Sequence, residues 1–338
     1  MSHRQERRLK KKDAVKAGIV VALLLCLLAG GVLALRFWEN RQYATGSDEV
    51  GSAVITTTED GKLITYNGTT YKQREDLETY LLMGVDVEGK AVGVNSYQGG
   101  GQADVQMVLV VDNANKTWQV LQLTRDTITK VPVLDVMGEV AAYIDEQIAL
   151  AHYYGNGLES SCKNTELAVS MLLDDQPIDG YFSLNMDAVG ILTDLVGGVT
   201  LTVTSDFSEV DSSLVQGETV TLTGSKALTY VRTRWDVDDQ TNIARMARQR
   251  QFLTALEEKL KQQDTQFAAT AYEELSDYMV TDIASGPAAK IGEKLKQYKQ
   301  LDTLTIAGDN VIENEHWAYH LDETSRQETV LQLFYEKQ

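Results

Sequence analysis

The chain is poor in cysteine. Its 338 residues include two, Cys26 and Cys162. Cys26 lies in an apolar N-terminal run, so Cys162 has no second cysteine to pair with in the rest of the chain. An exported protein without a disulfide is more typical of a Gram-positive cell surface than of a disulfide-rich secretion route.

Basic charge is also scarce. The sequence has 31 lysines and arginines against 49 aspartates and glutamates, a net charge of −18. Seven of the basic residues lie in residues 1–16, so residues 36–338 carry 24 basic and 47 acidic side chains, a net charge of −23. Such a surface repels nucleic acid and anionic lipid headgroups. The composition therefore excludes a general polyanion-binding role and a nucleic-acid partner.

Several catalytic motifs are missing. The sequence contains no G-x-S-x-G, Walker A or C-x-x-C motif and no internal repeat. His316 and His320 are four residues apart, but no base follows at metalloprotease spacing, so we interpret them as structural rather than as zinc ligands. His152 is isolated in the sequence.

The N-terminus has the pattern of a membrane anchor. Residues 17–35 contain no charged side chain, and a helix of this length spans roughly 30 Å, the thickness of a hydrocarbon core. The apolar region of a cleavable signal peptide is usually shorter, about 7–15 residues. We therefore predict an uncleaved transmembrane helix over 17–35, a cytoplasmic basic tail over 1–16, and residues 36–338 outside the cell.

The rest of the chain divides into a polar stalk, residues 36–75, and a globular domain, residues 76–338, with no second boundary inside it. A short hairpin is expected near 62–72. The patterns predict strands near 79–86, 104–112, 117–124 and 197–203. They predict helices near 137–153, 164–174, 186–196, 223–230, 243–262, 267–278, 285–299 and 323–337. This alternation favours a three-layer α/β/α domain.

Two aspartates are expected at one edge of the predicted sheet. Strands 104–112 and 117–124 form a hairpin, which places Asp104 and Arg125 at the same end. Asp86 ends the preceding strand and reaches the same edge if that strand runs parallel to 117–124. Two carboxylates joined by a glycine-rich loop are suited to Mg²⁺. Alternatively, both are ordinary acids at strand ends and the loop is merely flexible.

The segment 230-YVRTRWDVDDQTNIARMARQRQ-251 concentrates five arginines. Arg232 and Arg234 point the same way if their segment is extended. The helix that follows places Arg245, Arg248, Gln249 and Phe252 on one face. Arg250 lies about 140° from Arg245 around the helix axis, so it is not expected to join them. Such a face, together with the helix N-terminus, suits a phosphate or pyrophosphate. The pattern fits equally well a solvated basic face paired with Asp236, Asp238 and Asp239.

Several segments together resemble one known family. They are 82-LMGVD-86, 103-AD-104, 123-LTRDT-127, 193-TDLVGGVTLTV-203, 222-LTGSKALTYVRTR-234 and 245-RMARQRQFL-253. In this order and spacing they are similar to the LytR-CpsA-Psr (LCP) family of bacterial cell-wall proteins. The resemblance covers about residues 79–262 and extends more loosely to 338.

The resemblance implies a function and a fold. Members of that family are extracytoplasmic phosphotransferases that take a glycopolymer, such as teichoic acid or capsule, from a polyprenyl-pyrophosphate carrier. They attach it to peptidoglycan through a phosphodiester, and some also show pyrophosphatase activity. The implied fold is a mixed central sheet between helices, with an apolar tunnel for the lipid.

The resemblance also assigns roles to residues. It implies that Asp86 and Asp104 lie beside the Mg²⁺–pyrophosphate site and, with Arg125, form the catalytic set. It implies pyrophosphate-binding roles for Arg125, Arg232, Arg234, Arg245 and Gln249. The chemistry is consistent with these residue types, because phosphoryl transfer depends on positioning and charge neutralisation, and an aspartate can take the proton of a sugar hydroxyl.

The chain departs from the family pattern at three places. Gln102 stands where an arginine is usual, Lys90 is the only cation soon after Asp86, and Gln147, Ile148 and Ala149 replace a Lys-x-Asn element. One lost charge-stabilising group typically costs about 2.7–4 kcal/mol of transition-state stabilisation. The alternatives are therefore a divergent, non-catalytic member that binds polyprenyl phosphates or wall polymer as a sensor or scaffold, and an exported α/β domain whose arginines are only structural.

Overall fold

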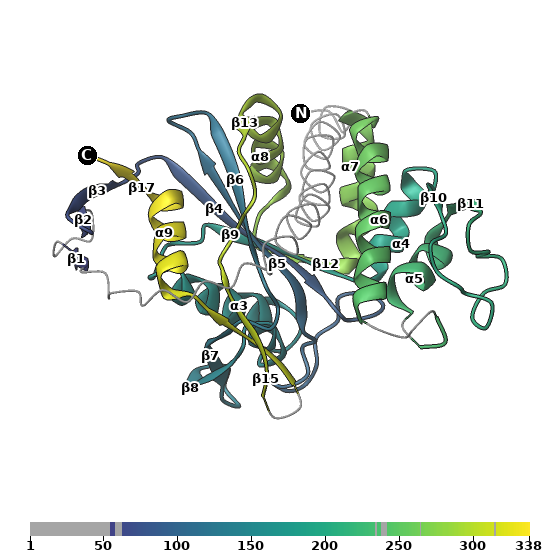
Figure 1. Cartoon of the computed structure of the whole chain (residues 1–338), viewed down its shortest axis with the longest axis horizontal. Helices are drawn as coiled ribbons and strands as arrows, with labels where there is room; N and C mark the ends of the chain where they lie inside the picture. The colour runs from purple at the N-terminus through teal and green to yellow at the C-terminus, as the bar shows by residue number, and fades with distance from the viewer. Residues whose placement is uncertain (1–54, 58–62, 234, 238–241, 264, 314–315) are drawn as a thin grey trace, which may run out of the picture. The chain divides into compact units, whose positions relative to one another are not determined.

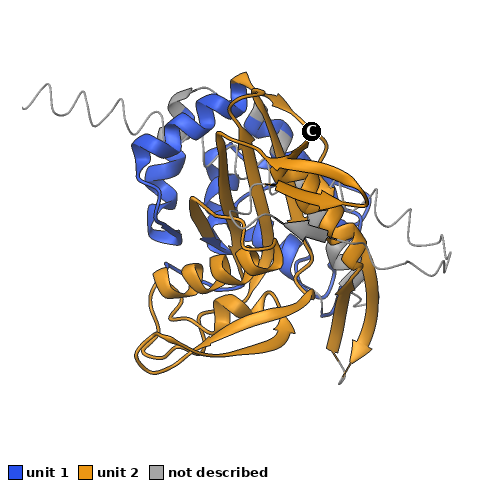
Figure 2. Ribbon diagram, turned by 90° about the vertical axis from the view of Figure 1, so that its left-hand side faces the viewer, with its two compact units in different colours: residues 1–33, 86–91, 184–296 blue, residues 34–85, 92–183, 297–338 orange. Residues whose placement is uncertain are grey.

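The computed structural model describes residues 55–57, 63–233, 235–237, 242–263, 265–313 and 316–338 (Figure 1). The predicted tail, the transmembrane helix over 17–35 and the first part of the stalk lie outside these residues. Among the described residues, no helix combines the length and the hydropathy needed to cross a membrane. The chain forms two compact units (Figure 2). As far as described, unit 1 comprises residues 86–91 and 184–296, and unit 2 comprises 55–85, 92–183 and 297–338.

Unit 2 is built on a mixed sheet. Its strand order is β9-β4-β5-β6-β13, and β14 also pairs with β6. The bounds are β4 Leu77–Val85, β5 Ala103–Asp112, β6 Thr117–Leu123, β9 Gly180–Asn185, β13 Lys299–Gln300 and β14 Leu304–Thr305. β5 is antiparallel to both β4 and β6, so β4 and β6 are parallel, and β13 and β14 run parallel to β6. The predicted mixed sheet is confirmed, with the long apolar runs of β4, β5 and β6 buried as expected for central strands.

A second sheet in unit 2 joins the predicted stalk to the end of the chain. Its order is β1 (Ile55–Thr57), β2 (Leu63–Tyr66), β3 (Thr69–Gln73) and β17 (Tyr335–Lys337). The hairpin expected near 62–72 is confirmed as β2–β3, which turns at Asn67 and Gly68 with φ of 49° and 76°. The helix predicted over 323–337 is too long. α9 ends at Phe334, and residues 335–337 pair with β3 instead.

Arg74 explains part of that early helix end. Its backbone N–H donates to the Phe334 carbonyl at 2.8 Å. Its guanidinium donates to the Tyr335 and Gln332 carbonyls at 3.0 and 3.1 Å and to Asp112 at 3.0 Å. The last carbonyls of a helix have no partner within the helix. A distant arginine and strand β3 therefore supply partners that the sequence of α9 alone does not reveal.

The helix predicted over 137–153 is wrong for most of its length. Residues 128–147 form an antiparallel hairpin, β7 (Ile128–Leu134) and β8 (Val140–Gln147). Within the predicted range 137–153, the helical part is the short α2 (Leu150–Tyr153). The Asp135 carboxylate accepts hydrogen bonds from the N–H groups of Met137 and Glu139 at 2.7 and 3.1 Å, and Gly138 has φ of 84°. An aspartate and a left-handed glycine form a turn here, which the apolar periodicity conceals.

Helices complete unit 2. α3 (Glu159–Leu172) confirms the helix predicted near 164–174, and β15 (Gly308–Glu313) and β16 (His316–Leu321) form a further hairpin. Asp322 caps the N-terminus of α9 (Glu323–Phe334), and its carboxylate accepts from the Ser325 N–H at 2.7 Å.

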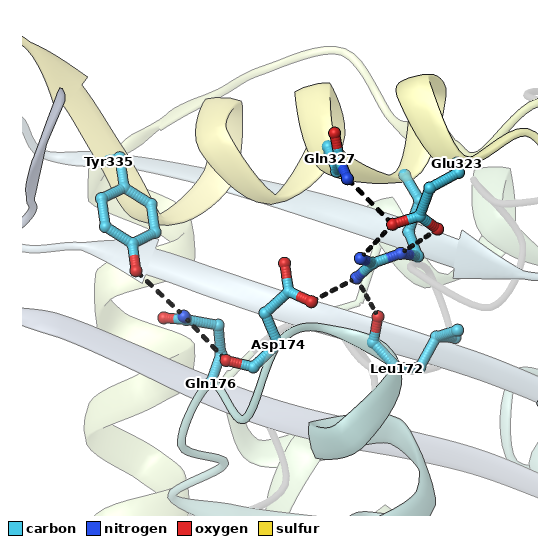
Figure 3. A network of polar contacts seen from close by, with 7 residues as sticks. Leu172, Asp174, Gln176, Glu323, Gln327 and Tyr335 are labelled. Atoms are coloured by element: carbon cyan, nitrogen blue, oxygen red, sulfur yellow. Dashed lines mark hydrogen bonds and ion pairs between the residues drawn. The ribbon is translucent and has the colours of Figure 1, made fainter. Parts of the chain in front are cut away.

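One arginine fixes α9 to the end of α3. Arg326 donates to both oxygens of Glu323 at 2.6 and 2.8 Å, to Asp174 at 2.7 Å and to the Leu172 carbonyl at 2.8 Å (Figure 3). Its side chain is only 14% exposed. These bonds raise the pKa of Arg326 and lower the pKa of Glu323, so both groups stay charged. The cluster compensates a largely buried charge and ties two distant helices together.

Unit 1 consists of helices and a small hairpin. The helices are α4 (Asp187–Leu195), α5 (Gly224–Arg232), α6 (Asn242–Lys261), α7 (Thr265–Leu275) and α8 (Ser285–Gln297). β10 (Val199–Thr202) pairs antiparallel with β11 (Thr219–Leu222), and the 3-10 turn η1 (Ser276–Tyr278) leads into β12 (Met279–Thr281). α4 contacts α5 and α7, and α6 contacts α5 and β10. All five helices lie where the sequence predicted them, within a few residues.

Candidate functional site

Asp104 and Arg125 meet at the end of the β5–β6 hairpin in unit 2. The register pairs Gln106 with Leu123, so two residues further on Asp104 faces Arg125. The Arg125 guanidinium donates to the Asp104 carboxylate, and its other Nη donates to the Gln102 side-chain oxygen at 2.7 Å. Arg125 and Asp104 are 35% and 34% exposed. The predicted meeting of these two residues is confirmed, and solvent can reach both.

Asp126 belongs to the same cluster, although sequence reasoning assigned it no role. One of its carboxylate oxygens lies 3.4 Å from Arg125 Nε and accepts from the Gln147 side-chain amide at 3.1 Å. Burial raises the pKa of Asp126, and the neighbouring Arg125 opposes that rise. The available signal was its place directly after Arg125 in 123-LTRDT-127.

Residues 147–149 support the cluster from a neighbouring segment. The Gln147 amide bridges Asp126 and the Trp317 carbonyl, the latter at 2.6 Å. The Ala149 N–H donates to the Arg125 carbonyl at 3.2 Å, and the Ala149 carbonyl accepts from Ala103 at 3.1 Å. Where the family pattern has a Lys-x-Asn element, this chain therefore uses a neutral amide and backbone hydrogen bonds.

The loop before Asp104 is attached to the helices of unit 2. The N–H groups of Gly99 and Gly100 donate to the Tyr153 carbonyl at 3.0 and 3.2 Å. A Cβ on Gly100 would lie 2.4 Å from Ser161 Oγ and 2.6 Å from the His152 carbonyl. The buried His152 ring lies 3.2 Å from the Gly101 carbonyl, which supports its structural role. Gly100 is thus a buried, close-packed point of this loop, whereas Gly99 is exposed.

Asp86 directly follows β4, is exposed and belongs to unit 1. The residues after it are held by unit 1. The Gly89 N–H donates to the Asp187 carboxylate, and the Val87 carbonyl accepts from the Met186 N–H at 3.0 Å. Lys90, the cation that follows Asp86, pairs with Asp277 at 2.7 Å.

Arg232 ends α5 and contacts the carboxylate of Glu88. The two side chains are 39% and 64% exposed. An exposed ion pair of this kind contributes little to stability. Arg232 is therefore accessible for exchanging Glu88 for another anion, as a phosphate-binding role requires.

Arg248 has a different place from the one that its helical position indicated. It is 1% exposed, and its guanidinium donates to the Tyr230 carbonyl at 3.1 Å, to Ser205 Oγ at 3.2 Å and to the Thr233 carbonyl. It also lies over the Phe207 ring, 5.3 Å from the ring centroid. The helical spacing left the role of Arg248 undecided, and the structure gives it a structural one, because its donors are occupied inside the protein. Instead, Arg248 donates to the backbone carbonyl of Thr233, the residue between Arg232 and Arg234 in the sequence.

Other residues of the arginine segment lie outside the part of the chain that the structure describes. These are the predicted ligand Arg234, and Asp238 and Asp239, which the alternative interpretation pairs with the arginines. Arg245, Gln249 and Arg250 lie on α6, but the structure does not describe their side chains. The pyrophosphate-binding roles of Arg234, Arg245 and Gln249 therefore stay predictions.

The described residues contain no group of three or more His, Cys, Asp and Glu suited to a metal ion. Asp86 and Asp104 offer carboxylate oxygens, the ligand type that Mg²⁺ prefers. Mg²⁺ is commonly held by one or two carboxylates and completed by phosphate and water. Asp86 belongs to unit 1 and Asp104 to unit 2, and each by itself offers a carboxylate of the type that Mg²⁺ accepts. His320 instead pairs with Glu313 at 2.9 Å.

Comparison with known sequences shows the family. The family model described as the LytR_cpsA_psr family matches residues 43–334, so the chain belongs to this family. A similar relative is the polyisoprenyl-teichoic acid–peptidoglycan teichoic acid transferase TagU of Bacillus subtilis, 27% identical over 75% of this chain and 72% of the relative. The protein of the same name from Enterococcus faecalis is 26% identical over 83% and 82% of the two chains.

Solved structures share the fold. Bacillus subtilis TagV superposes with a TM-score of 0.54 at 23% identity, covering 78% of this chain and 96% of that chain. Protein gbs0355 of Streptococcus agalactiae has a TM-score of 0.57 at 20% identity, covering 76% and 86%. The mixed α/β fold implied by the resemblance is thereby confirmed.

Proposed function

We propose that this protein is a transferase that moves a teichoic-acid-type or capsule-type glycopolymer from a polyprenyl-pyrophosphate carrier to peptidoglycan. The observation that carries the proposal is the Arg125–Asp104 pair at the carboxyl end of β6. Family membership and the names of the relatives support it. Arginine and carboxylate in contact at a solvent-accessible edge suit a reaction that needs both charge neutralisation and a base.

The reaction can be written with this chain's own residues. A sugar hydroxyl of the acceptor attacks the phosphorus attached to the polymer, and its proton passes to the Asp104 carboxylate. The bond from that phosphorus to the bridging oxygen breaks, and polyprenyl phosphate leaves. Arg125 neutralises charge on the phosphoryl oxygens while its contacts with Asp104 and Gln102 hold it in orientation. With water in place of the sugar, the same step is the proposed pyrophosphatase activity.

We assign Asp86 and Asp104 as the residues that would hold Mg²⁺. When bound, the ion supplies neutralisation of pyrophosphate charge. Both side chains are accessible to solvent, and carboxylate oxygens are suitable ligands. A loss of activity in chelator that Mg²⁺ restores would support this assignment, and full activity in chelator would refute it.

Pyrophosphate binding is assigned to Arg125, Arg232, Arg234, Arg245 and Gln249. Arg232 is the member of unit 1 whose side chain is described, and its exposed contact with Glu88 can be exchanged for a phosphate oxygen. We further propose that residues 17–35 anchor the chain in the cell membrane of a Gram-positive bacterium, with the basic tail inside and residues 36–338 outside. An apolar tunnel would hold the prenyl chain.

A second candidate is a non-catalytic protein that binds polyprenyl phosphates or wall polymer as a sensor or scaffold. The observation that favours it is the use of the neutral amides Gln102 and Gln147 beside Arg125 and Asp126. This candidate predicts binding without turnover, and binding that survives Asp104→Ala.

The full chain in detergent, supplied with Mg²⁺, a polyprenyl-pyrophosphate glycan donor and peptidoglycan fragments, tests the two candidates. The transferase reading expects transfer, with a loss of about 10²-fold or more in Asp104→Asn and in Arg125→Ala. Lys130→Ala, an exposed cation on β7, is the control and should keep full activity. Donor binding without transfer or phosphate release, with a TagU relative active in parallel, would favour the sensor.

A further inference from the structure

The β15–β16 hairpin of unit 2 carries an exposed apolar pair. Ile312 and Trp317 are cross-strand partners and are 65% and 55% exposed. Asn310 and Tyr319, the next pair on the same face, include a tyrosine that is only 1% exposed. This face therefore runs from the core at Tyr319 outward to an apolar surface at Trp317. The opposite face carries Glu313, His316 and His320.

Hydrogen bonds join this hairpin to the Asp104–Arg125–Asp126 cluster. The Trp317 carbonyl accepts from Gln147 at 2.6 Å, and the same amide donates to Asp126 at 3.1 Å. The Tyr319 N–H donates to the Asp126 carbonyl at 2.8 Å, and Thr127 forms a parallel bridge with Tyr319. The contact between β16 and β7 agrees with this arrangement. The backbone of residues 317–319 is thus held next to Asp126, through the Gln147 side chain at Trp317 and through the N–H of Tyr319.

We propose that Trp317 and Ile312 form a sugar-binding platform for the acceptor glycan, an inference that rests on the transferase function proposed above. The C–H face of a sugar ring is apolar and carries partial positive charge, and it is attracted to the negative face of an indole. The nearby Asp126 carboxylate and the side-chain oxygen of Gln147, whose N–H groups are both engaged, are acceptors suited to sugar hydroxyls. Aromatic, carboxylate and amide groups together suit an oligosaccharide better than a purely apolar partner.

Charge favours the acceptor over the donor polymer. The described strands of the hairpin carry the carboxylates Asp309 and Glu313 and no lysine or arginine. The phosphates of the donor polymer find no cation there and belong with Arg125, whereas an uncharged stretch of peptidoglycan sugar is not repelled by the hairpin. The platform therefore presents the acceptor hydroxyl to Asp104.

The test uses the full chain in detergent and two readouts. In the transfer assay, Trp317→Ala should raise the KM for peptidoglycan fragments about threefold to tenfold, while the donor KM and phosphate release without acceptor stay unchanged. By calorimetry, the Kd for an N-acetylglucosamine tetrasaccharide should rise by a similar factor. Trp317→Phe should lie between wild type and alanine.

Ile312→Ser tests the same platform without altering the indole, should Trp317→Ala fail to fold. Val136→Ala, at the 91% exposed residue of the β7–β8 turn, is the matched apolar control and should change neither readout. An unchanged acceptor KM and tetrasaccharide Kd in folded Trp317 and Ile312 variants overturns the proposal, and so does a rise in the donor KM alone. If wild type binds the tetrasaccharide without any transfer and Trp317→Ala loses that binding, the platform stands and the transferase function fails.

Discussion

The side-chain oxygen of Gln102 accepts a hydrogen bond from Arg125 at 2.7 Å, at a position where the family pattern has another arginine. Arg125 is therefore held on one side by Asp104 and on the other by a neutral amide. In place of the expected arginine, Gln102 provides an acceptor that orients Arg125. Substitution of Gln102 therefore tests whether Arg125 alone is sufficient in this cluster of unit 2.

Gln102→Arg should strengthen donor binding. The cluster already holds two carboxylates, Asp104 and Asp126, around a single guanidinium, so a second cation would balance the charge. We expect the donor KM to fall several-fold, and phosphate release to rise if charge neutralisation limits it. Steady-state kinetics of phosphate release checks this. Gln102→Ala, which removes the bond to Arg125 without adding charge, should lower the rate, and a faster Gln102→Ala enzyme would contradict the argument.

Substitutions of Arg248 and Arg232 should have different effects: the first should lower stability, and the second should weaken donor binding. Arg248→Met leaves the backbone carbonyls of Tyr230 and Thr233 without the donor that Arg248 supplies. The free energy of unfolding should therefore fall by about 2–4 kcal/mol. Arg232→Ala removes an exposed ion pair and should change stability by less than about 1 kcal/mol while weakening donor binding. Urea titration and donor KM are the two measurements. Equal losses of stability in both variants would be the opposite result.

The Arg326 cluster predicts a pH-dependent contribution of Glu323. Hydrogen bonds from Arg326 lower the pKa of Glu323 below the ordinary value of 4.5. A carboxylate whose pKa is lower in the folded state than in the unfolded state stabilises the fold at pH values above its unfolded-state pKa. This stabilisation disappears as the pH falls through the folded-state pKa. Glu323→Gln should therefore cost about 0.5–1 kcal/mol at neutral pH, allowing for the exposure of this side chain, and almost nothing in strong acid.

Thermal unfolding of Glu323→Gln and wild type across the acid range measures that difference. Glu328→Gln, an exposed glutamate on the same helix, is the control and should show little difference from wild type at any pH. A stability loss in Glu323→Gln that stays constant from neutral to strongly acid pH would show that the Arg326 cluster is not responsible.

Gly100→Ala should disturb the loop that leads to Asp104. The added Cβ would lie 2.4 Å from Ser161 Oγ and 2.8 Å from the Gly157 backbone nitrogen, distances at which something must move. We expect a loss of roughly 1–3 kcal/mol in stability and a larger fractional loss in kcat than in donor binding. Gly286→Ala, where a Cβ meets nothing within 4 Å, is the matched control. Similar behaviour of the two variants would show that the loop tolerates the displacement.

Sequence patterns predicted the elements that depend on local signals. The hairpin of β5 and β6 follows from two apolar runs around a short turn, and that hairpin alone brings Asp104 to Arg125. Helices α4, α5, α7 and α8 of unit 1 were equally accessible to prediction, because each has an amphipathic or apolar stretch. Periodicity and turn residues were sufficient to predict an element wherever tertiary contacts did not override its local secondary-structure preference.

Elements decided by distant partners were missed. Residues 335–337 continue a helical pattern, but β3 offers them a strand partner. Arg248 has the helical spacing of a surface arginine, and only the carbonyls and the Phe207 ring around it make a buried position stable. The same limit applies to Asp126, whose role depends on Gln147 and Arg125 together. Tertiary contacts of this kind leave no periodic trace in the sequence.

Strand β17 has a consequence for how the protein is made. It pairs with β3, and a bond from Arg74 to the Tyr335 carbonyl joins residues 261 positions apart. The second sheet of unit 2 therefore stays incomplete until residues 335–337 have been synthesised, and β3 presents an unpaired edge in the meantime. A fusion placed after β17 should therefore be tolerated far better than removal of residues 335–337.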